Sequence, residues 1–189
     1  MSNLIDRYLL FRIRTKRDPE AFAKIYDRYV KALYRFTLLK LPSQEEAQDI
    51  TAETFTRTWG YLQEHQEVTH IRALLYRVAR NLIADYYRNR PVSAGVDPSA
   101  VTFEGDSTST TDTGLDDKGR EQRVIEARAE LSLVVKQLER LKEDYRDVVT
   151  LRLVDGLAFE DIADVLGKSV GNVRVIYHRA LKALKEIDS

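Results

Sequence analysis

The sequence contains no cysteine, only three histidines and only eight glycines among its 189 residues. Without cysteine the chain can form no disulfide, no thiolate zinc site and no cysteine nucleophile. The histidines, at positions 65, 70 and 178, lack the i, i+4 spacing of a helical metal pair, and no glycine-rich phosphate loop or nucleophile elbow is present. We therefore expect no metal, no cofactor and no enzymatic activity on a small-molecule substrate.

A long apolar run and an excess of charge of either sign are also lacking. No stretch approaches the ~18 to 20 apolar residues needed to cross a membrane, and the N-terminus has no signal-peptide core of adequate length. We therefore expect a cytoplasmic protein that does not insert into membranes. Because 30 basic residues balance 30 acidic ones, any nucleic-acid binding must come from local basic patches.

The stretch 145–187 contains two helical patterns separated by a short break. Apolar residues recur at helical spacing from Phe159 to Leu166, and Gly167 follows at a position suited to the left-handed conformation past a helix end. Ser169 can then cap the next helix, because its hydroxyl accepts from backbone N–H groups that the first turn leaves unpaired. Two helices joined by so short a turn indicate a helix-turn-helix.

The second helix of this motif separates apolar from basic residues. Val173, Ile176 and Ala180 fall on one side, while Lys168 to Lys185 contains five Lys or Arg and no Asp or Glu. The preceding stretch, Glu139 to Asp164, carries eight acids and four bases. Charged residues often form only a solvated helix face, but this segregation of like charges favours contact with DNA.

The pattern of residues from the N-terminus to about Leu62 predicts three further helices. Residues 1–17 carry five bases and one acid and read as a short helix. Asp-Pro-Glu at 18–20 places a cap residue and a proline at a helix start, and Ser43–Glu46 is a capping box that opens a helix to about Leu62. Between these starts, large residues at three- and four-residue spacing predict a buried stripe: Phe22, Ile25, Tyr26, Tyr29, Leu33 and Phe36.

A second basic element follows a loop at 64–69. The helix predicted from His70 to Tyr87 buries an apolar face, and the stretch 71–90 contains five arginines and one acid. From Pro91 the composition turns to Ser, Thr, Gly and Asp, which cannot bury enough apolar surface to offset the entropy of ordering. Helical spacing resumes from Glu121 to Leu141. We therefore predict an all-α protein of two small helical domains, 1–90 and 121–189, joined by a flexible acidic linker at 91–120.

Four segments in this order resemble one family: DPEAFAKIYDRYV, EEAQDITAETFTRTW, IRALLYRVARNLIADYYR and YRDVVTLRLVDGLAFEDIADVLGKSVGNVRVIYHRALKAL. They are similar to the extracytoplasmic-function (ECF) sigma factors of bacterial RNA polymerase, in the sigma-70 superfamily. The resemblance covers both predicted domains, which correspond to a region 2 helical bundle and a region 4 helix-turn-helix. It implies an alternative sigma factor whose partners are core RNA polymerase, promoter DNA and, commonly, an anti-sigma factor.

The resemblance also implies which residues make these contacts. Asp49, Glu53 and Arg57, a polar stripe at i, i+4 and i+8, are implied to bind the polymerase. The residues implied to hold the melted minus-ten element are Arg72, Arg77, Arg80, Asn81 and Arg88. Those implied to contact the minus-thirty-five element are Ser169, Asn172, Arg174, His178, Arg179 and Lys182.

Two departures from the family pattern limit what the resemblance implies about DNA sequence preference. Ile71 and Leu74 stand where relatives often have aromatic residues, and Val175 and Ile176 stand where the recognition helix usually has polar ones. The promoter sequence preference therefore cannot be transferred from relatives. A stand-alone helix-turn-helix regulator that binds duplex DNA without polymerase is the alternative, and it predicts tight operator binding by the chain alone.

Overall fold

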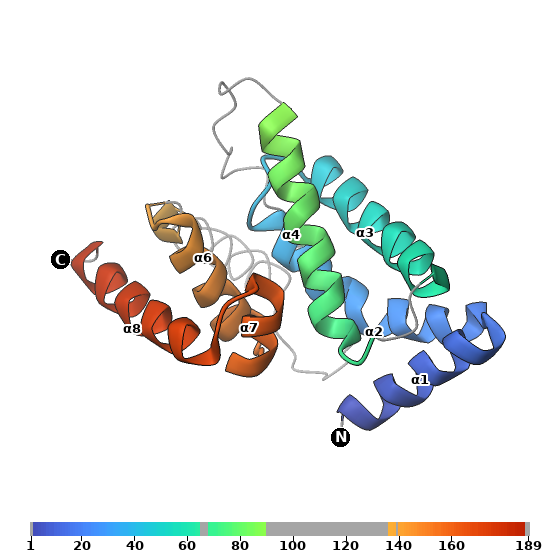
Figure 1. The fold of residues 1–189 in the computed structure, drawn as a ribbon. Coiled ribbons are helices and arrows are strands. Elements are labelled where there is room, and N and C mark those ends of the chain that lie inside the picture. The colour runs from blue at the N-terminus through green and yellow to red at the C-terminus, as the bar shows by residue number, and fades with distance from the viewer. Residues whose placement is uncertain (1, 65–67, 90–135, 139, 188–189) are drawn as a thin grey trace, which may run out of the picture.

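The computed structural model describes residues 2–64, 68–89, 136–138 and 140–187 (Figure 1). All regular elements in this part of the chain are helices, which confirms the predicted all-α class. Four of them, α1 (Ser2–Lys16), α2 (Pro19–Leu38), α3 (Gln44–Glu64) and α4 (Ile71–Asn89), form an N-terminal unit. The helices α6 (Glu143–Val149), η2 (Thr150–Val154), α7 (Phe159–Leu166) and α8 (Val170–Ile187) form a C-terminal unit. The predicted linker and most of the helix predicted from Glu121 lie outside the described residues.

Local capping chemistry sets the helix starts of the N-terminal unit. The Asp18 side chain accepts hydrogen bonds from the backbone N–H groups of Glu20 and Ala21, and Pro19 occupies the first turn, as predicted. The Ser43 hydroxyl accepts from the Glu46 N–H at 3.3 Å and donates to the Glu46 carboxylate at 2.8 Å. The capping box is thus present, and its second hydrogen bond joins the side chains of Ser43 and Glu46.

Four of the six residues of the stripe predicted on α2 are buried, while Phe22 is partly buried and Tyr26 is exposed. Ile25, Leu33 and Phe36 are at most 1% exposed and Tyr29 is 6% exposed, but Tyr26 is 43% exposed. The prediction of a buried Tyr26 was therefore wrong. Its ring lies against Phe55 of α3, with centroids 4.7 Å apart, on the outer side of the α2–α3 pair. The periodicity predicted the helix correctly, but it assigned Tyr26, at the edge of the stripe, to the buried face.

The C-terminal unit begins with a helix that changes its winding. The α6 helix continues into the π-helical turn η2, which ends near Gly156, a residue with φ of 64°. Leu157 then returns to the core, where its N–H donates to the Leu151 carbonyl at 2.9 Å. This short reversal lays α7 against α4 of the N-terminal unit.

The two units pack against each other along α4. Buried residues of the C-terminal unit, Leu151, Leu157 and Ile162 among them, belong to the same apolar cluster as Leu75 and Ala79 of α4. Figure 1 shows α4 between α3 on one side and α6 and α7 on the other, with α8 at the outer edge. No helix in the described part of the chain is long and apolar enough to span a bilayer. The contact between the units decides which basic residues remain accessible.

Candidate nucleic-acid interface

The turn of the predicted helix-turn-helix is present as the sequence indicated. Gly167 ends α7 with φ of 62° and ψ of 35°, and its N–H donates to the Ala163 carbonyl. The Ser169 hydroxyl accepts from the N–H of Asn172 at 3.3 Å and so caps α8. The left-handed glycine and the cap together fix the angle at which α8 leaves α7, with the rings of Phe159 and Tyr177 packed edge to face, 5.5 Å apart, between the two helices.

The outer face of α8 does not pack against the protein core, and it is mainly polar. Val173, Ile176 and Ala180 are buried on the inner face. Ile176 is therefore a core residue, and of the two apolar departures in this helix only Val175, at 46% exposed, changes the outer face. The sequence-predicted residues of this face are all exposed: Ser169, Asn172, Arg174, His178, Arg179 and Lys182.

One of these residues is held by its neighbours on α7. The Arg174 guanidinium lies 3.6 Å from the Glu160 carboxylate and 5.7 Å from the centroid of the Phe159 ring. Both contacts are at the surface, so they orient the side chain without burying it. The arginine can exchange Glu160 for a phosphate at little cost, because exposed ion pairs contribute only about 0 to 1 kcal/mol.

The arginines of α4 lie in a different environment from the one the sequence suggested. Three of them reach across to the C-terminal unit: Arg72 donates to the backbone carbonyl of Asp155, and Arg77 donates to the carbonyl of Asp164 at 2.6 Å. Arg80 pairs with carboxylates of α6, as described below. A buried apolar face and five arginines within 71–90 suggest that the arginines lie on the outside; Arg77 does, whereas Arg72 and Arg80 are only partly exposed. Their interdomain partners lie 67 to 87 residues away in sequence, too far for local pattern to reveal.

A buried ionic cluster joins the units at the centre of their contact. The Asp147 carboxylate of α6 is 1% exposed and accepts from Lys40, which is 8% exposed, and from Arg80 Nε at 2.7 Å. Glu143 and Asp144 lie 3.6 and 4.0 Å from the same guanidinium. Burial alone would lower the pKa of Arg80, but the hydrogen bond to Asp147 and these nearby carboxylates raise it overall. Arg80 therefore stays charged while three acids surround it.

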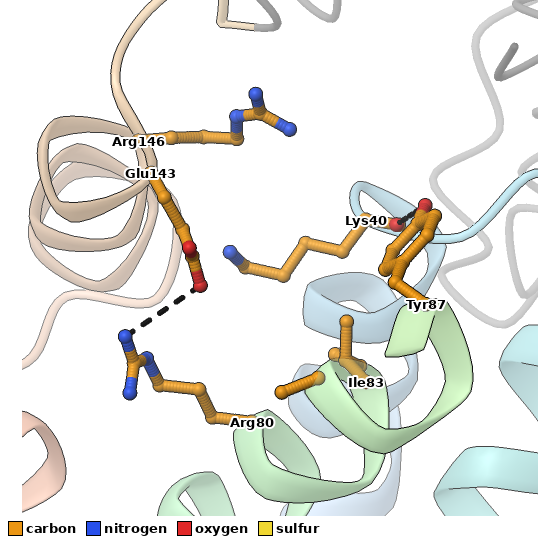
Figure 2. A pocket seen from close by; sticks show the side chains of 7 residues that line it. Lys40, Arg80, Ile83, Tyr87, Glu143 and Arg146 are labelled. Atoms are coloured by element: carbon orange, nitrogen blue, oxygen red, sulfur yellow. Dashed lines mark hydrogen bonds and ion pairs between the residues drawn. The ribbon is translucent and has the colours of Figure 1, made fainter. Parts of the chain in front are cut away.

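A hollow of about 370 Å³ lies beside this cluster. Side chains enter it from both units (Figure 2). Its lining residues are Lys40, Arg80, Ile83, Ala84, Tyr87, Glu143 and Arg146. The Tyr87 hydroxyl donates to the Lys40 carbonyl at 2.5 Å, which ties the end of α4 to the α2–α3 connection. Sequence reasoning missed Lys40 and Asp147, because a single lysine after a helix and a single acid among eight carry no distinguishing pattern.

A second ionic contact lies toward the N-terminal end of α4. Asp155 Oδ1 is 3.5 Å from the Arg35 guanidinium, and the Asp155 side chain is fully buried. Burial raises the pKa of this carboxyl to about 6, although Arg35 and Arg72 oppose the shift. Burial and the negative charge of Asp155 together raise the pKa of the Tyr76 hydroxyl, which is buried nearby. Burial therefore favours the neutral form of Asp155, while its arginine neighbours favour the charged form.

The remaining predicted residues are exposed. Asn81 and Arg88 of α4 lie outside the contact between the units, and Arg88 pairs with Asp85 one turn earlier. On α3, Asp49, Glu53 and Arg57 form the expected exposed stripe, with Arg57 Nε 2.7 Å from Glu53 Oε1. No cluster of His, Asp or Glu among the described residues is placed to hold a metal ion.

The polar stripe on α3 borders an apolar groove that the sequence did not indicate. The groove has a volume of about 500 Å³ and is lined by Pro19, Phe22, Tyr26, Ala52, Phe55, Thr56 and Trp59. The aromatic spacing on α2 could have revealed it, had Tyr26 been assigned to the rim of the helix pair. A charged stripe beside an open aromatic groove is suited to a partner helix with both apolar and charged residues.

This arrangement, a helical bundle packed on a helix-turn-helix, is that of a sigma-70-type transcription factor. Comparison with known families agrees: Sigma-70 region 2 matches residues 25–91, and Sigma-70 region 4 matches residues 131–184.

Among curated relatives, the chain is 30% identical over 172 residues to the ECF RNA polymerase sigma factor SigW of Bacillus subtilis, with 90% of each chain covered. It is 31% identical over 182 residues to the RNA polymerase sigma-H factor of Pseudomonas aeruginosa, covering 95% of this chain and 91% of the relative. It is also 27% identical over 171 residues to the ECF RNA polymerase sigma factor BldN of Streptomyces coelicolor. That match covers 90% of this chain and 61% of BldN. The chain belongs to the ECF sigma factor family.

Solved structures show the same fold. CnrH, in complex with the cytosolic domain of CnrY, superposes with a TM-score of 0.70 at 23% identity, covering 97% of this chain and 96% of that one. The sigma factor RpoE of Bartonella quintana, in complex with the anti-sigma factor NepR, superposes with a TM-score of 0.61 at 21% identity, covering 87% and 94%. At these identities the likeness concerns the fold.

Proposed function

We propose that the chain is an alternative sigma factor that binds core RNA polymerase in the cytoplasm, aligns it on a two-part promoter and melts the upstream edge of the bubble. Residues 1–90 bind the polymerase and the minus-ten element, and residues 121–189 bind the minus-thirty-five element. The protein carries out no covalent chemistry, because binding free energy is used to open DNA. Joining two weak DNA readers on one polymerase raises the effective concentration of each.

The observation that carries the proposal is the outer face of α8. It is exposed, it follows a capped helix-turn-helix turn, and Arg174, Arg179 and Lys182 lie on it. Lysine and arginine on the second helix of such a motif contact phosphates and base edges in the major groove. The stand-alone regulator is not favoured, since the relatives match along both units and carry the sigma factor name.

The polymerase contact is assigned to α3. The exposed stripe of Asp49, Glu53 and Arg57 would fix the orientation of a polymerase helix by charge, while the neighbouring groove with Tyr26 and Trp59 would take its apolar side chains. Charged residues at the rim then mainly set specificity and association rate, and the aromatic groove contributes most of the affinity.

The contact between the units bears on the minus-ten function. Arg72, Arg77 and Arg80 already donate to acceptors of the C-terminal unit. In this closed arrangement the carboxylates of Glu143, Asp144 and Asp147 around Arg80 would repel the phosphates of a promoter strand. We therefore expect the units to separate before α4 binds DNA. Two fold relatives were solved in complexes, CnrH with the cytosolic domain of CnrY and the sigma factor RpoE with the anti-sigma factor NepR, and an anti-sigma factor that stabilises the closed arrangement is a fitting partner for this chain.

The test is run-off transcription with purified chain and core polymerase on a library of genomic promoters. Promoter-specific transcripts are expected, and their absence with active core at several salt concentrations would refute the proposal. Reversing charge on α8, by Arg174→Glu with Lys182→Glu, should abolish dependence on the minus-thirty-five element and leave polymerase binding intact. The matched control is Asp49→Lys with Glu53→Lys, which should weaken polymerase binding and leave the α8 face unchanged.

A further inference from the structure

Helix α1 has two apolar faces, and only one of them is used by the fold. Leu9, Leu10 and Ile13 are 1 to 3% exposed and pack in the core. The opposite face carries Leu4 at 70% exposed, Ile5 at 50%, and Tyr8 and Phe11 at 59% each. At about 100° per residue these four side chains cover an arc of roughly 120°. Four of the nine large apolar side chains exposed in the described part of the chain therefore lie on one helix face, which marks it as a binding surface.

The charge around this face has one sign. Arg7, Arg14 and Lys16 are exposed beside it, and no ion pair in the described part of the chain involves them. The single acid of the helix, Asp6, is buried and is bound by the Tyr29 hydroxyl at 2.5 Å and by Arg28 at 3.4 Å. The surface therefore presents aromatic and aliphatic side chains between positive charges, and it fits an anionic partner with flat apolar groups.

We propose that the outer face of α1 binds single-stranded DNA of the promoter bubble, with Tyr8 and Phe11 stacking on bases and Arg7, Arg14 and Lys16 contacting phosphates. This inference rests on the proposed function, because it names a further site on a protein that opens a promoter. Single strands are bound by aromatic rings that stack on successive bases beside a basic track for the backbone. From Leu4 to Phe11 the helix rises about 10 Å, which matches roughly three base spacings of about 3.4 Å.

Position favours DNA over other anionic partners. Asp6 of α1 lines a hollow of about 110 Å³ with Thr69, His70, Ile71 and Arg72 at the start of α4, and Tyr29 of α2 and Asp161 of α7 complete its lining. The inner side of α1 thus lies beside the start of α4, the helix proposed to hold the minus-ten strand, and Figure 1 shows α1 at the outer edge of the N-terminal unit. A strand leaving α4 there would next meet α1.

Two other occupants are disfavoured on physical grounds. A second copy of the chain would bring the arginines of two α1 helices together, and like charges oppose such a dimer. A bilayer surface would receive only four apolar side chains from a helix whose other face stays in the protein core, which gives marginal membrane affinity. Neither partner accounts for the position of α1 beside the start of α4.

The test measures binding of a fluorescein-labelled oligo(dT) 15-mer to the full-length chain by anisotropy at low salt. Tyr8→Ser with Phe11→Ser should weaken binding at least about tenfold, since each stacked base contributes an effect of that order. Arg7→Gln with Arg14→Gln should reduce the slope of log K against log salt by about 1.4, at roughly 0.7 per phosphate contact on single strands. Affinity for a labelled duplex, which reports on α8, should not change in either variant.

Matched controls lie on other helices. Tyr61→Ser removes a 41% exposed tyrosine of α3, and Lys24→Gln removes an exposed charge of α2. Both should leave oligo(dT) binding unchanged. Equal affinity of the Tyr8/Phe11 variant and the unsubstituted chain overturns the inference, as does binding to phosphatidylglycerol vesicles that depends on the two rings while oligo(dT) binding does not.

Permanganate footprinting with core polymerase separates this inference from the proposed function. If the unsubstituted chain opens a promoter and the Tyr8/Phe11 variant binds polymerase but opens it less, the inference is supported. If both open it equally, the inference is overturned and the proposed function stands. If the unsubstituted chain opens no promoter with active core, the proposed function fails, and ring-dependent oligo(dT) binding still supports a single-strand site on α1.

Discussion

Replacing Asp147 with alanine should separate the two units. The carboxylate is an ion-pair partner of both Lys40 and Arg80, and Lys40 is only 8% exposed in the closed arrangement. Without the carboxylate, closure would bury the ammonium without the charge that now balances it. Removing one partner of a buried ion pair costs about 3 to 5 kcal/mol. The closed-to-open equilibrium should therefore shift toward the open form by about 150- to 5,000-fold.

The absence of cysteine makes this shift measurable by energy transfer. Cysteines introduced at the exposed positions Ala23 of α2 and Glu186 of α8 would carry the only labels on the chain. Transfer efficiency should fall in Asp147→Ala. The matched control is Asp164→Ala, because it removes an acid of α7 but keeps the backbone carbonyl that accepts from Arg77. Unchanged transfer in Asp147→Ala, with helix content intact by circular dichroism, would refute the reasoning.

Two further predictions concern pH and the turn. Because burial raises the pKa of Asp155 to about 6 from an ordinary 3.8, closure takes up a proton, so the closed form gains stability as pH falls from about 6 toward 4 and loses it as pH rises. The gain is at most about 3 kcal/mol, and Asp155→Asn should abolish this dependence in an energy-transfer titration. Gly167→Ala should lower the free energy of unfolding in denaturant by about 1 to 2 kcal/mol, since φ is 62° there. Gly60→Ala, within α3 and without positive φ, should instead raise it by about 0.5 to 1 kcal/mol.

Sequence alone predicted the features of the fold that depend on neighbouring residues. The range Phe159–Leu166 for α7, the left-handed Gly167 and the Ser169 cap all follow from chemistry within a few residues, and all three are confirmed. The Asp18 cap on α2 is confirmed for the same reason. The exposed face of α8 was also predictable, because one basic helix with an apolar side can face the core in only one way.

What could not be predicted depends on contacts between distant segments. Tyr26 fits the periodicity of a buried stripe, and only the position of α3 shows that it lies on a groove. Lys40 has no helical pattern around it, yet it is among the most buried charges in the structure. The α4 arginines were predicted as one basic element, but the carboxylate and carbonyl partners of Arg72, Arg77 and Arg80 come from a unit whose placement no local spacing encodes.

Part of the balance between acidic and basic residues lies in the contact between the two units, where acids of one unit pair with bases of the other. Glu143, Asp144 and Asp147, in the acid-rich stretch before α8, surround Arg80. These carboxylates balance the positive charge of Arg80 and would repel a phosphate, so closure opposes minus-ten binding by this arginine. The face of α8 takes no part in these ion pairs. A promoter could therefore be engaged first at the minus-thirty-five element by the closed chain, with the free energy of strand binding by α4 required to displace the acids of α6.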